Sequence, residues 1–206
     1  GKLTVSTLRQ LRHRRLALLL ATVASLADVT AAGAAELRVP AVAKALVQAV
    51  AAASVGDTII LEPGRHHGPI VLDRPLTIDG LGKAILIGDG TGSVVTINGQ
   101  DITIRGLEIA GSGNAHSPID SGIRVTRKAS RVLIEANRLV GNLHGITVHG
   151  AHDTIVRGNT ILGRRDFRLN DRGNGIYVWN APGTIVERND IRFGRDGIFS
   201  NTSTRN

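Results

Sequence analysis

The sequence contains neither cysteine nor methionine. The chain therefore forms no disulfide bond, and it offers no thiolate or thioether ligand to a soft metal ion. Aromatic residues are almost as scarce, since one Tyr, one Trp and three Phe make up 2% of the 206 residues. Hydrophobic residues nevertheless reach 42%, mostly Ala, Val, Ile and Leu, and there are 25 glycines. This composition favours a domain of many short strands joined by turns.

Residues 1–35 differ in character from the rest of the chain. Several arginines precede the apolar run LALLLATVASLA, and the small residues AAGAA follow it. This order is typical of a secretory signal peptide, here cut near Ala34 or Ala35. The apolar run is short for a membrane span, so a retained anchor is the less favoured alternative. We expect an exported protein, and the pair Arg14-Arg15 leaves the twin-arginine route open beside the general one.

The net charge of +8 is concentrated near the N-terminus. Residues 1–35 carry five of the 25 basic residues and one of the 17 acidic ones, which leaves a net charge of +4 for residues 36–206. Such a mild excess does not indicate nucleic-acid binding.

The segment PAVAKALVQAVAAAS, residues 40–54, predicts a short helix that begins at Pro40 and ends before Gly56. From residue 58 onward the chain consists of short apolar runs such as TIIL, PIVL and AILI, separated by Gly, Pro and Asp. We therefore expect a cap with a short helix at 36–57 and a strand-rich domain at 58–206. The last residues resemble the start of another repeat, so we expect this domain to be truncated at its C-terminal end.

Two short units recur after residue 100. The unit G-I-x-[V/S] appears as GIRV, GITV, GIYV and GIFS at residues 122, 145, 175 and 197, at steps of 23, 30 and 22 residues. A second unit runs ITIRGLEI, VLIEANRL, TIVRGNTI and TIVERNDI. The basic period is about 22 residues, and insertions at 110–121 and 162–174 lengthen it. Both insertions lie between the second unit and the next G-I. This pattern predicts a β-solenoid, whose coils lie ~4.8 Å apart and whose first coil the helix would cap.

Asn137, Asn159 and Asn189 occupy equivalent positions of the second unit. In a stacked solenoid they predict an internal ladder, in which side-chain amides bond to one another and to the turn backbone. A row of polar binding groups is the alternative.

All five aromatic residues fall within residues 167–199. In G-I-x-V the Ile and Val point inward, which turns two columns of side chains outward. The first column is Arg124, Thr147, Tyr177 and Phe199, and the second is Thr126, His149, Trp179 and Asn201. A clustered and exposed aromatic patch usually marks contact with another molecule. Tyr177, Trp179 and Phe199 are therefore a candidate partner surface.

The loop RRDFRLNDR at 164–172 carries four arginines and two aspartates beside this patch. Arg164, Arg165 and Arg168 are further candidates for partner docking. Two alternatives remain open: the loop is merely solvated, or segment 162–174 folds over the aromatic residues and forms a local minicore with them.

His144, His149 and His152 lie near one predicted turn. Three histidines at one corner are candidate ligands for copper or a soft divalent metal ion. Their spacing matches no specific metal motif, and a structural or surface role is the alternative.

Many β-solenoids are polysaccharide lyases or epimerases, which need acid–base groups and cations in a groove. No pair of carboxylates stands out in this sequence, and turn formation explains the aspartates. We therefore expect no enzyme activity, and a carbohydrate-active protein (a lyase, an epimerase or a sugar-binding module) is the alternative. The candidate residues for such chemistry are Asp120, Asp153, Asp171, Asp196, Arg124 and Lys128.

The stretch ALVQAVAAASVGDTIILEPGRHHGPIVLDRPLTIDG resembles the entry segment of secreted right-handed parallel β-helix proteins. The stretches GSVVTINGQDITIRGLEIAGSG, NDRGNGIYVWNAPG and RNDIRFGRDGIFSNTS resemble the NosD family of periplasmic maturation proteins of nitrous oxide reductase. The resemblance covers residues 40–206, roughly the N-terminal half of such a protein.

The resemblance implies an all-β fold, a right-handed parallel β-helix, in a periplasmic protein without enzyme activity. It implies a role in assembling the copper centre of nitrous oxide reductase, together with an ABC transporter (NosF and NosY) and the copper chaperone lipoprotein NosL. It implies contact with the membrane only through the transporter, and no nucleic acid. The family is linked to copper, but this chain lacks Met and Cys. Any Met-containing copper part would lie beyond residue 206, and a scaffold role fits residues 40–206 better.

Overall fold

The computed structural model describes residues 33–202 of the chain. The signal peptide predicted at 1–35 lies outside the described residues, except for its last three positions. Within residues 33–202 no helix has both the length and the apolar character needed to cross a membrane.

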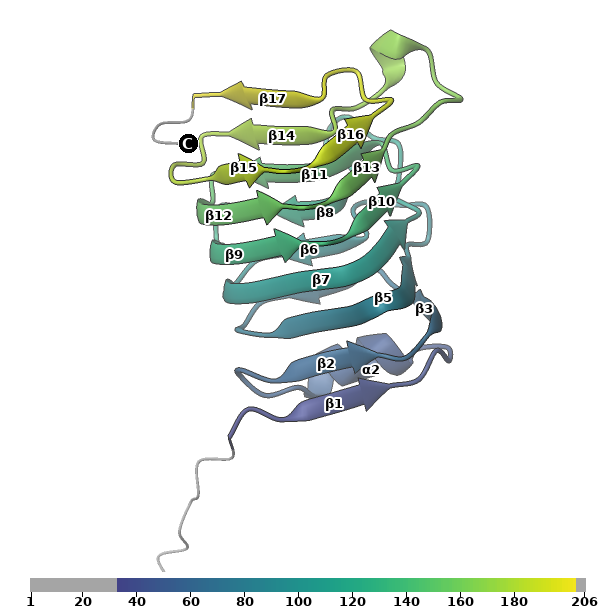
Figure 1. The fold of residues 1–206 in the computed structure, drawn as a ribbon, viewed down its shortest axis with the longest axis vertical. Helices are drawn as coiled ribbons and strands as arrows, with labels where there is room; N and C mark the ends of the chain where they lie inside the picture. The colour runs from purple at the N-terminus through teal and green to yellow at the C-terminus, as the bar shows by residue number, and fades with distance from the viewer. Residues whose placement is uncertain (1–32, 203–206) are drawn as a thin grey trace, which may run out of the picture. The chain divides into compact units, whose positions relative to one another are not determined.

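Parallel strands make up most of the regular structure of residues 33–202 (Figure 1). They form two sheets, sheet A and sheet B. Sheet B contains, in this order, β4 (Ile70–Leu72), β6 (Val95–Ile97), β8 (Ser121–Val125), β11 (His144–His149), β14 (Ile176–Trp179) and β17 (Ile198–Asn201). Sheet A contains β1 (Glu36–Val39), β2 (Thr58–Leu61), β3 (Gly64–His67), β5 (Thr77–Ile87), β7 (Gln100–Ala110), β9 (Ser130–Glu135), β10 (Arg138–Val140), β12 (His152–Arg157), β13 (Thr160–Leu162), β15 (Ile185–Glu187) and β16 (Asp190–Arg192).

Successive coils of the chain stack on one another. The strands β8, β9 and β10 form one coil, β11, β12 and β13 form the next, and β14, β15 and β16 form the one after it. Asparagines that bond to each other across neighbouring coils are 22 or 30 residues apart in sequence. The insertions 110–121 and 162–174 both connect sheet A back to sheet B. The predicted parallel β-helix with coils of about 22 residues is confirmed.

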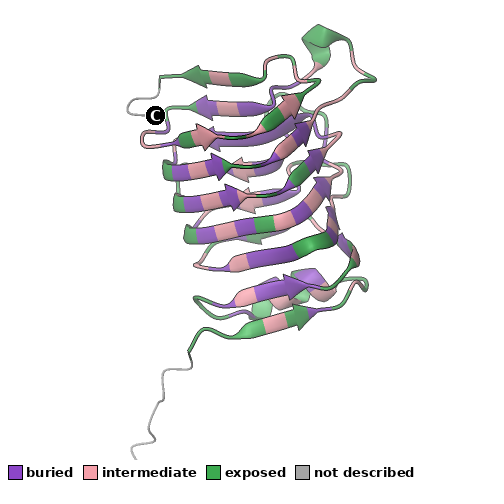
Figure 2. Ribbon diagram, viewed as in Figure 1, coloured by how far each residue is buried: buried purple, intermediate pink, exposed green. Residues whose placement is uncertain are grey.

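Aliphatic side chains fill the interior between the sheets. Figure 2 shows that buried residues recur along the strands of successive coils. Val95, Ile123, Ile146 and Ile176 are paired on successive strands of sheet B, and none of them is exposed to solvent. Among the described residues, no Phe, Tyr or Trp belongs to the buried core. The composition therefore predicts the character of the core correctly.

The glycines of three of the four repeat units, Gly122, Gly145 and Gly175, mark close approaches between coils. A Cβ atom on Gly145 would collide with the carbonyl oxygen of Gly175 and with the side chain of Ile161. A Cβ atom on Gly175 would collide with Ile191 in the same way. A larger residue would push the coils apart, which explains why the repeat carries glycine here.

The helix α2 (Ala45–Ala52) packs against the first strands, including β4 at the edge of sheet B, and buries Leu46 and Val50. The guanidinium of Arg74 donates hydrogen bonds to the carbonyl oxygens of Val50 (2.6 Å) and Ala53 (3.0 Å) at the end of the helix. These carbonyl groups have no partner within a helix, so Arg74 caps it.

This helix is shorter than the predicted 40–54. Lys44 has a φ angle of 67°, a left-handed conformation that prevents the helix from extending back to Pro40. The predicted cap also contains a strand, because residues 36–39 form β1 and pair with β2. The first coil therefore begins before the helix.

Each of the three coils from β8 to β16 contributes two strands to sheet A, and a turn joins the two strands within the coil. Asparagine side chains in these turns form a ladder that runs from one coil to the next. Asn159 Oδ1 accepts hydrogen bonds from the backbone N–H (3.0 Å) and the Nδ2 (3.1 Å) of Asn137. Asn189 Oδ1 accepts the same pair from Asn159, at 2.9 and 3.0 Å. Asn137 Oδ1 accepts from the backbone N–H of Leu107 at 3.1 Å. The ladder satisfies polar groups that these turns would otherwise leave unpaired inside the protein.

The substitution Asn159→Ala tests the ladder. It removes the acceptor of two buried donors on Asn137, so we expect the free energy of unfolding to fall by about 2–4 kcal/mol. Urea denaturation followed by circular dichroism measures this change. The exposed Asn170 is the matched control, and Asn170→Ala should change stability by about 0.5 kcal/mol or less. Equal denaturation midpoints for the two variants would contradict a stabilising ladder.

Candidate functional site

The outward side chains of sheet B lie in columns that cross the coils. Strand pairing between β8, β11, β14 and β17 sets which residues are neighbours in a column. We call this outward surface the sheet B face. The pairing places Arg124, Thr147, Tyr177 and Phe199 in one column and His149, Trp179 and Asn201 in the other.

Tyr177 is at the centre of a cluster of rings on the sheet B face. Its ring meets those of His149 and Phe199 edge to face, with 4.5 and 5.2 Å between centroids. The ring of His144 lies 6.1 Å from Tyr177, and that of Trp179 lies 5.8 Å from His149. Tyr177 and Phe199 are half-buried, while Trp179 is 43% exposed. The three candidate partner-surface aromatics thus belong to one patch, and Trp179 is its most exposed member.

The two insertions meet beside this cluster and cover part of it. Arg164 Nη1 donates to Asn114 Oδ1 at 2.8 Å, and His116 Nε2 lies 3.2 Å from the carbonyl oxygen of Asp171. His144 is only 4% exposed, and the backbone N–H of Asn174 in the second insertion donates to its Nδ1 at 3.0 Å. The loops therefore cover the His144 end of the cluster and leave the Trp179 end open.

The three candidate docking arginines of the second insertion have different surroundings. Arg164 pairs with Asp166 at 2.9 Å, which ties it into the packing of the loop itself. The guanidinium of Arg165 lies over the ring of Phe193, 4.7 Å from its centroid. Arg165 and Arg168 are exposed, so these two remain accessible to a partner.

Burial lowers the pKa values of His144 and His149 from 6.5 to about 4. Desolvation is the largest cause for both, and the positive charges of His116 near His144 and of Arg124 near His149 add to it. Both imidazoles are therefore neutral at pH 7. Because His144 Nδ1 accepts a hydrogen bond, its Nε2 carries the proton. His149 Nε2 is buried without a hydrogen-bond partner in residues 33–202.

The structure does not bring the three predicted metal ligands together. His144 and His149 lie on β11 in sheet B, and both rings contact Tyr177. His152 is exposed on β12 in sheet A, because the turn at Gly150 carries the chain from one sheet to the other. Within the described residues no group of three His, Asp or Glu side chains is arranged to hold a metal ion.

An open groove lies at the edge of the sheet B face, where its strands turn toward sheet A. We call it the Trp179 groove, and its volume is about 490 Å³. Three of its residues come after the strands, one position beyond the second outward column. The sequence pattern therefore did not identify them. Aligning the second residue after each unit would place Arg127, Gly150 and Asn180 together. The lining residues are Arg124, Thr126, Arg127, His149, Gly150, Trp179 and Asn180.

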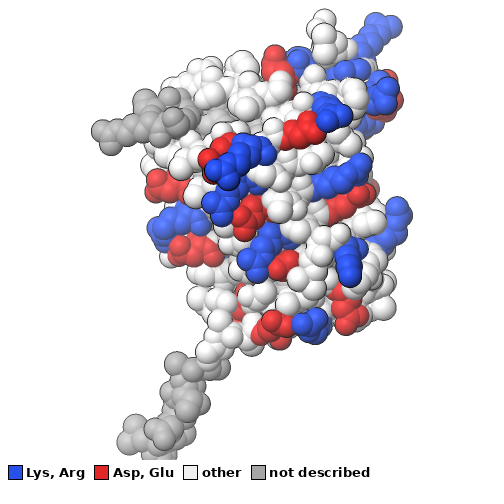
Figure 3. Space-filling view, in the orientation of Figure 1, with Lys and Arg blue, Asp and Glu red and all other residues white. Residues whose placement is uncertain are grey.

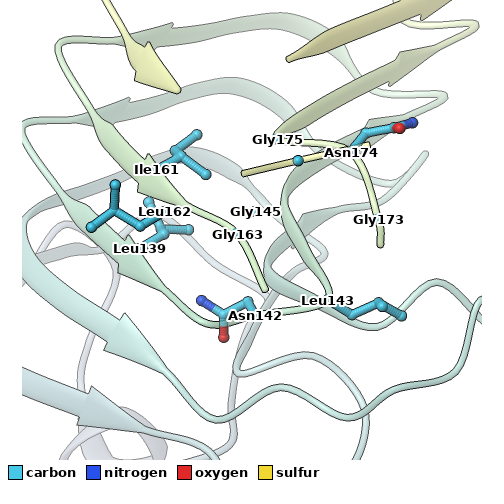
Figure 4. Close-up of a pocket in the computed structure, with 11 residues that line it drawn as sticks. Leu139, Asn142, Leu143, Gly145, Ile161, Leu162, Gly163, Gly173, Asn174 and Gly175 are labelled. Atoms are coloured by element: carbon cyan, nitrogen blue, oxygen red, sulfur yellow. The ribbon is translucent and has the colours of Figure 1, made fainter. Parts of the chain in front are cut away.

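A second space near the second insertion is only a packing gap (Figure 4). Leu139, Ile161 and Asn174 are among its lining residues, and it has no room for a water-sized molecule. Figure 4 shows the Asn174 side chain pointing away from Leu139 and Ile161. This gap offers no ligand site.

The candidate acid–base residues are spread over the molecule. Asp120 is buried, and its Oδ2 accepts the backbone N–H of Ala115 at 2.9 Å. Asp153 and Lys128 are exposed. None of the four candidate aspartates, which include Asp171 and Asp196, lines the Trp179 groove beside Arg124.

Residues 88–206 match the family model described as a right handed beta helix region. The chain belongs to this family. Two curated relatives of this β-helix protein carry the name "Probable ABC transporter binding protein NosD", from Stutzerimonas stutzeri (32% identical) and Pseudomonas aeruginosa (34% identical). Each match spans 137 residues, which are 66% of this chain but only 31% and 32% of the relatives. The resemblance to NosD is confirmed, over about a third of the length of those proteins.

Among solved structures, this β-helix protein resembles an alginate lyase from Paenibacillus sp. str. FPU-7. The TM-score is 0.66 at 22% identity, and the likeness covers 82% of this chain and 65% of the lyase. At this identity the likeness establishes the shared fold alone.

Acid should destabilise the protein through the buried His144 and the half-buried His149. Their folded pKa values of about 4 lie below the usual 6.5, so the unfolded chain takes up protons at a higher pH than the folded one. We therefore expect the free energy of unfolding to fall as the pH decreases from 6.5 toward 4.

Urea denaturation at several pH values in this window measures the effect. His144→Asn keeps an acceptor for the Asn174 N–H and should show a weaker pH dependence than the original protein. An unchanged pH dependence in this variant would mean that the buried, neutral His144 does not contribute.

Proposed function

We propose that this chain is the β-helical part of a NosD-like accessory protein that binds partner proteins through its sheet B face. The observation that carries the proposal is the ring cluster of Tyr177, Trp179 and Phe199, because the aliphatic core has no structural need for it. Trp and Tyr are enriched at the residues that contribute most to protein–protein binding. The names of the two curated relatives include the words ABC transporter binding protein, which supports a role in binding another protein.

In this proposal the protein acts in the periplasm, as a scaffold during assembly of the copper site of nitrous oxide reductase. Its partners are an ABC transporter (NosF and NosY), the copper chaperone lipoprotein NosL and the reductase itself. It reaches the membrane through the transporter and has no enzyme activity of its own.

Copper is the cargo of this process, and the described coils do not fit a copper site of their own. The Nδ1 of His144 is already an acceptor, and the ring of His149 packs against Tyr177. The sequence also lacks the Met and Cys ligands that copper(I) favours. We therefore assign residues 33–202 to partner binding and not to copper ligation.

Sugar binding is the second candidate function, because an exposed Trp beside arginines also suits a sugar ring that carries an acidic group. Lyase or epimerase chemistry is less well supported, since no carboxylate lines the Trp179 groove.

The substitution Trp179→Ala tests partner docking. It removes the most exposed ring of the patch, and we expect binding of the purified transporter, NosL or reductase to weaken at least tenfold for one of them. Surface plasmon resonance measures the affinity, and circular dichroism checks that the β spectrum is intact.

Ile185→Ala is the matched control, because Ile185 is 47% exposed on sheet A and lies outside the sheet B face. Equal affinities of the two variants for all three partners would refute docking through Trp179.

A further inference from the structure

Two arginines of the Trp179 groove have no anionic partner. Within residues 33–202, neither Arg124 nor Arg127 takes part in an ion pair or a side-chain hydrogen bond. Neither outward column of the sheet B face contains an Asp or a Glu. This end of the groove is therefore a site of uncompensated positive charge.

Sheet A shows the opposite arrangement. There, arginines bond to carboxylates on the preceding coil, as in Arg138 with Glu108 and Arg157 with Glu135, both at 2.9 Å. Arg105 with Asp79 and Arg131 with Asp101 are bonded in the same way at 2.7 Å. Figure 3 views the sheet A side, where basic and acidic residues lie next to one another. On sheet A, carboxylates of the preceding coil thus neutralise the charge of these arginines. In the Trp179 groove, the charges of Arg124 and Arg127 have no such partner.

A missing side chain keeps the groove open. Gly150 lies between Arg127 and Asn180 in the column of turns that follows sheet B, and its N–H donates to the carbonyl oxygen of Trp179 at 2.9 Å. A Cβ atom at Gly150 would lie only 2.8 Å from the Cβ of Arg127. Glycine therefore leaves space between the arginine end and the tryptophan end of the groove.

The spacing of the two ends fits an extended peptide. The arginines belong to the coil of β8, and Trp179 belongs to the coil of β14, two coils further along. With ~4.8 Å between neighbouring strands, the two ends lie ~10 Å apart along the stack. An extended peptide in the polyproline II conformation rises ~3.1 Å per residue and has about three residues per turn, so side chains three residues apart lie on the same side and cover about this distance.

We propose that the Trp179 groove binds an extended acidic segment of a partner protein. Arg124 and Arg127 hold an Asp or Glu carboxylate, and an apolar side chain about three residues away packs on Trp179. This inference rests on the proposed function and adds the chemistry of the partner. Arg and Trp together are typical of protein-binding hot spots, and arginine binds carboxylates in a two-pronged geometry, which favours a protein segment here.

The single Trp of the chain makes the groove directly observable, because all tryptophan fluorescence comes from Trp179. We would titrate the full chain with a blocked octapeptide that lacks Trp and Tyr and carries Glu and Phe three residues apart. We expect a saturable fluorescence change, and the peptide affinity should fall as salt is added. A copy with Gln in place of Glu, and a copy with Glu next to Phe, should each bind at least tenfold more weakly.

The double substitution Arg124→Gln with Arg127→Gln should reduce peptide affinity at least tenfold. Lys128→Gln is the matched control, because Lys128 is an exposed cation next to Arg127 that does not line the groove. Equal binding of the Glu and Gln peptides, or equal losses in the double variant and the control, would overturn the inference. Saturation of the fluorescence change by oligouronates, without a response to the peptide, would overturn it in favour of an acidic sugar.

The same variants separate this inference from the proposed function. If Trp179→Ala loses partner binding while the arginine double variant keeps it, docking stands and the acidic segment is refuted. If Trp179→Ala keeps partner binding but the Glu peptide still binds the groove through its arginines, the docking proposal fails and the carboxylate site remains.

Discussion

Backbone hydrogen bonding between successive coils is the constraint on which the rest of the structure depends. It holds each strand against its equivalent one coil away, so residues at equivalent positions of the repeat become direct neighbours. Inside, this contact selects aliphatic side chains that stack, and glycine where the backbones approach most closely. At one turn it selects asparagine, whose side chain bonds both to the backbone and to the next asparagine. The core, the glycines and the ladder are three consequences of one geometry.

The same stacking explains how a regular scaffold can carry the proposed binding surface. Outward residues at equivalent positions of successive coils are direct neighbours in a column. Their side chains can differ in type from coil to coil without disturbing the packing of the core. On sheet A these columns alternate arginine with carboxylate and are self-compensating. On the sheet B face they change from Arg124 and Thr147 to Tyr177 and Phe199, with no acid among them. The proposed partner segment, acidic and apolar, would supply what this face lacks.

Much of this architecture is predictable from the sequence because a repeat carries its own register. The steps between G-I-x-V units predict which residues are neighbours, and the insertions predict the corner where the loops meet. Features outside the repeat are not predictable in this way. The start of α2 depends on the left-handed conformation of Lys44, and the predicted histidine set ignored the turn at Gly150 that sends His152 to the other sheet. The groove was missed because Arg127 and Asn180 follow the strands and lie beyond the columns that the pattern defines.

Site-specific photocrosslinking tests the central claim, that the sheet B face binds an acidic protein segment, most directly. A benzophenone side chain at Asn180, on the wall of the Trp179 groove, would be activated in cells that express the transporter, NosL and the reductase. The account predicts crosslinks from Asn180 to a stretch of one of these proteins that contains Asp or Glu, identified by mass spectrometry, and none of them from Ile185 on sheet A. Crosslinks to the same peptides from both positions, or crosslinks from Asn180 to saccharide alone, would contradict it.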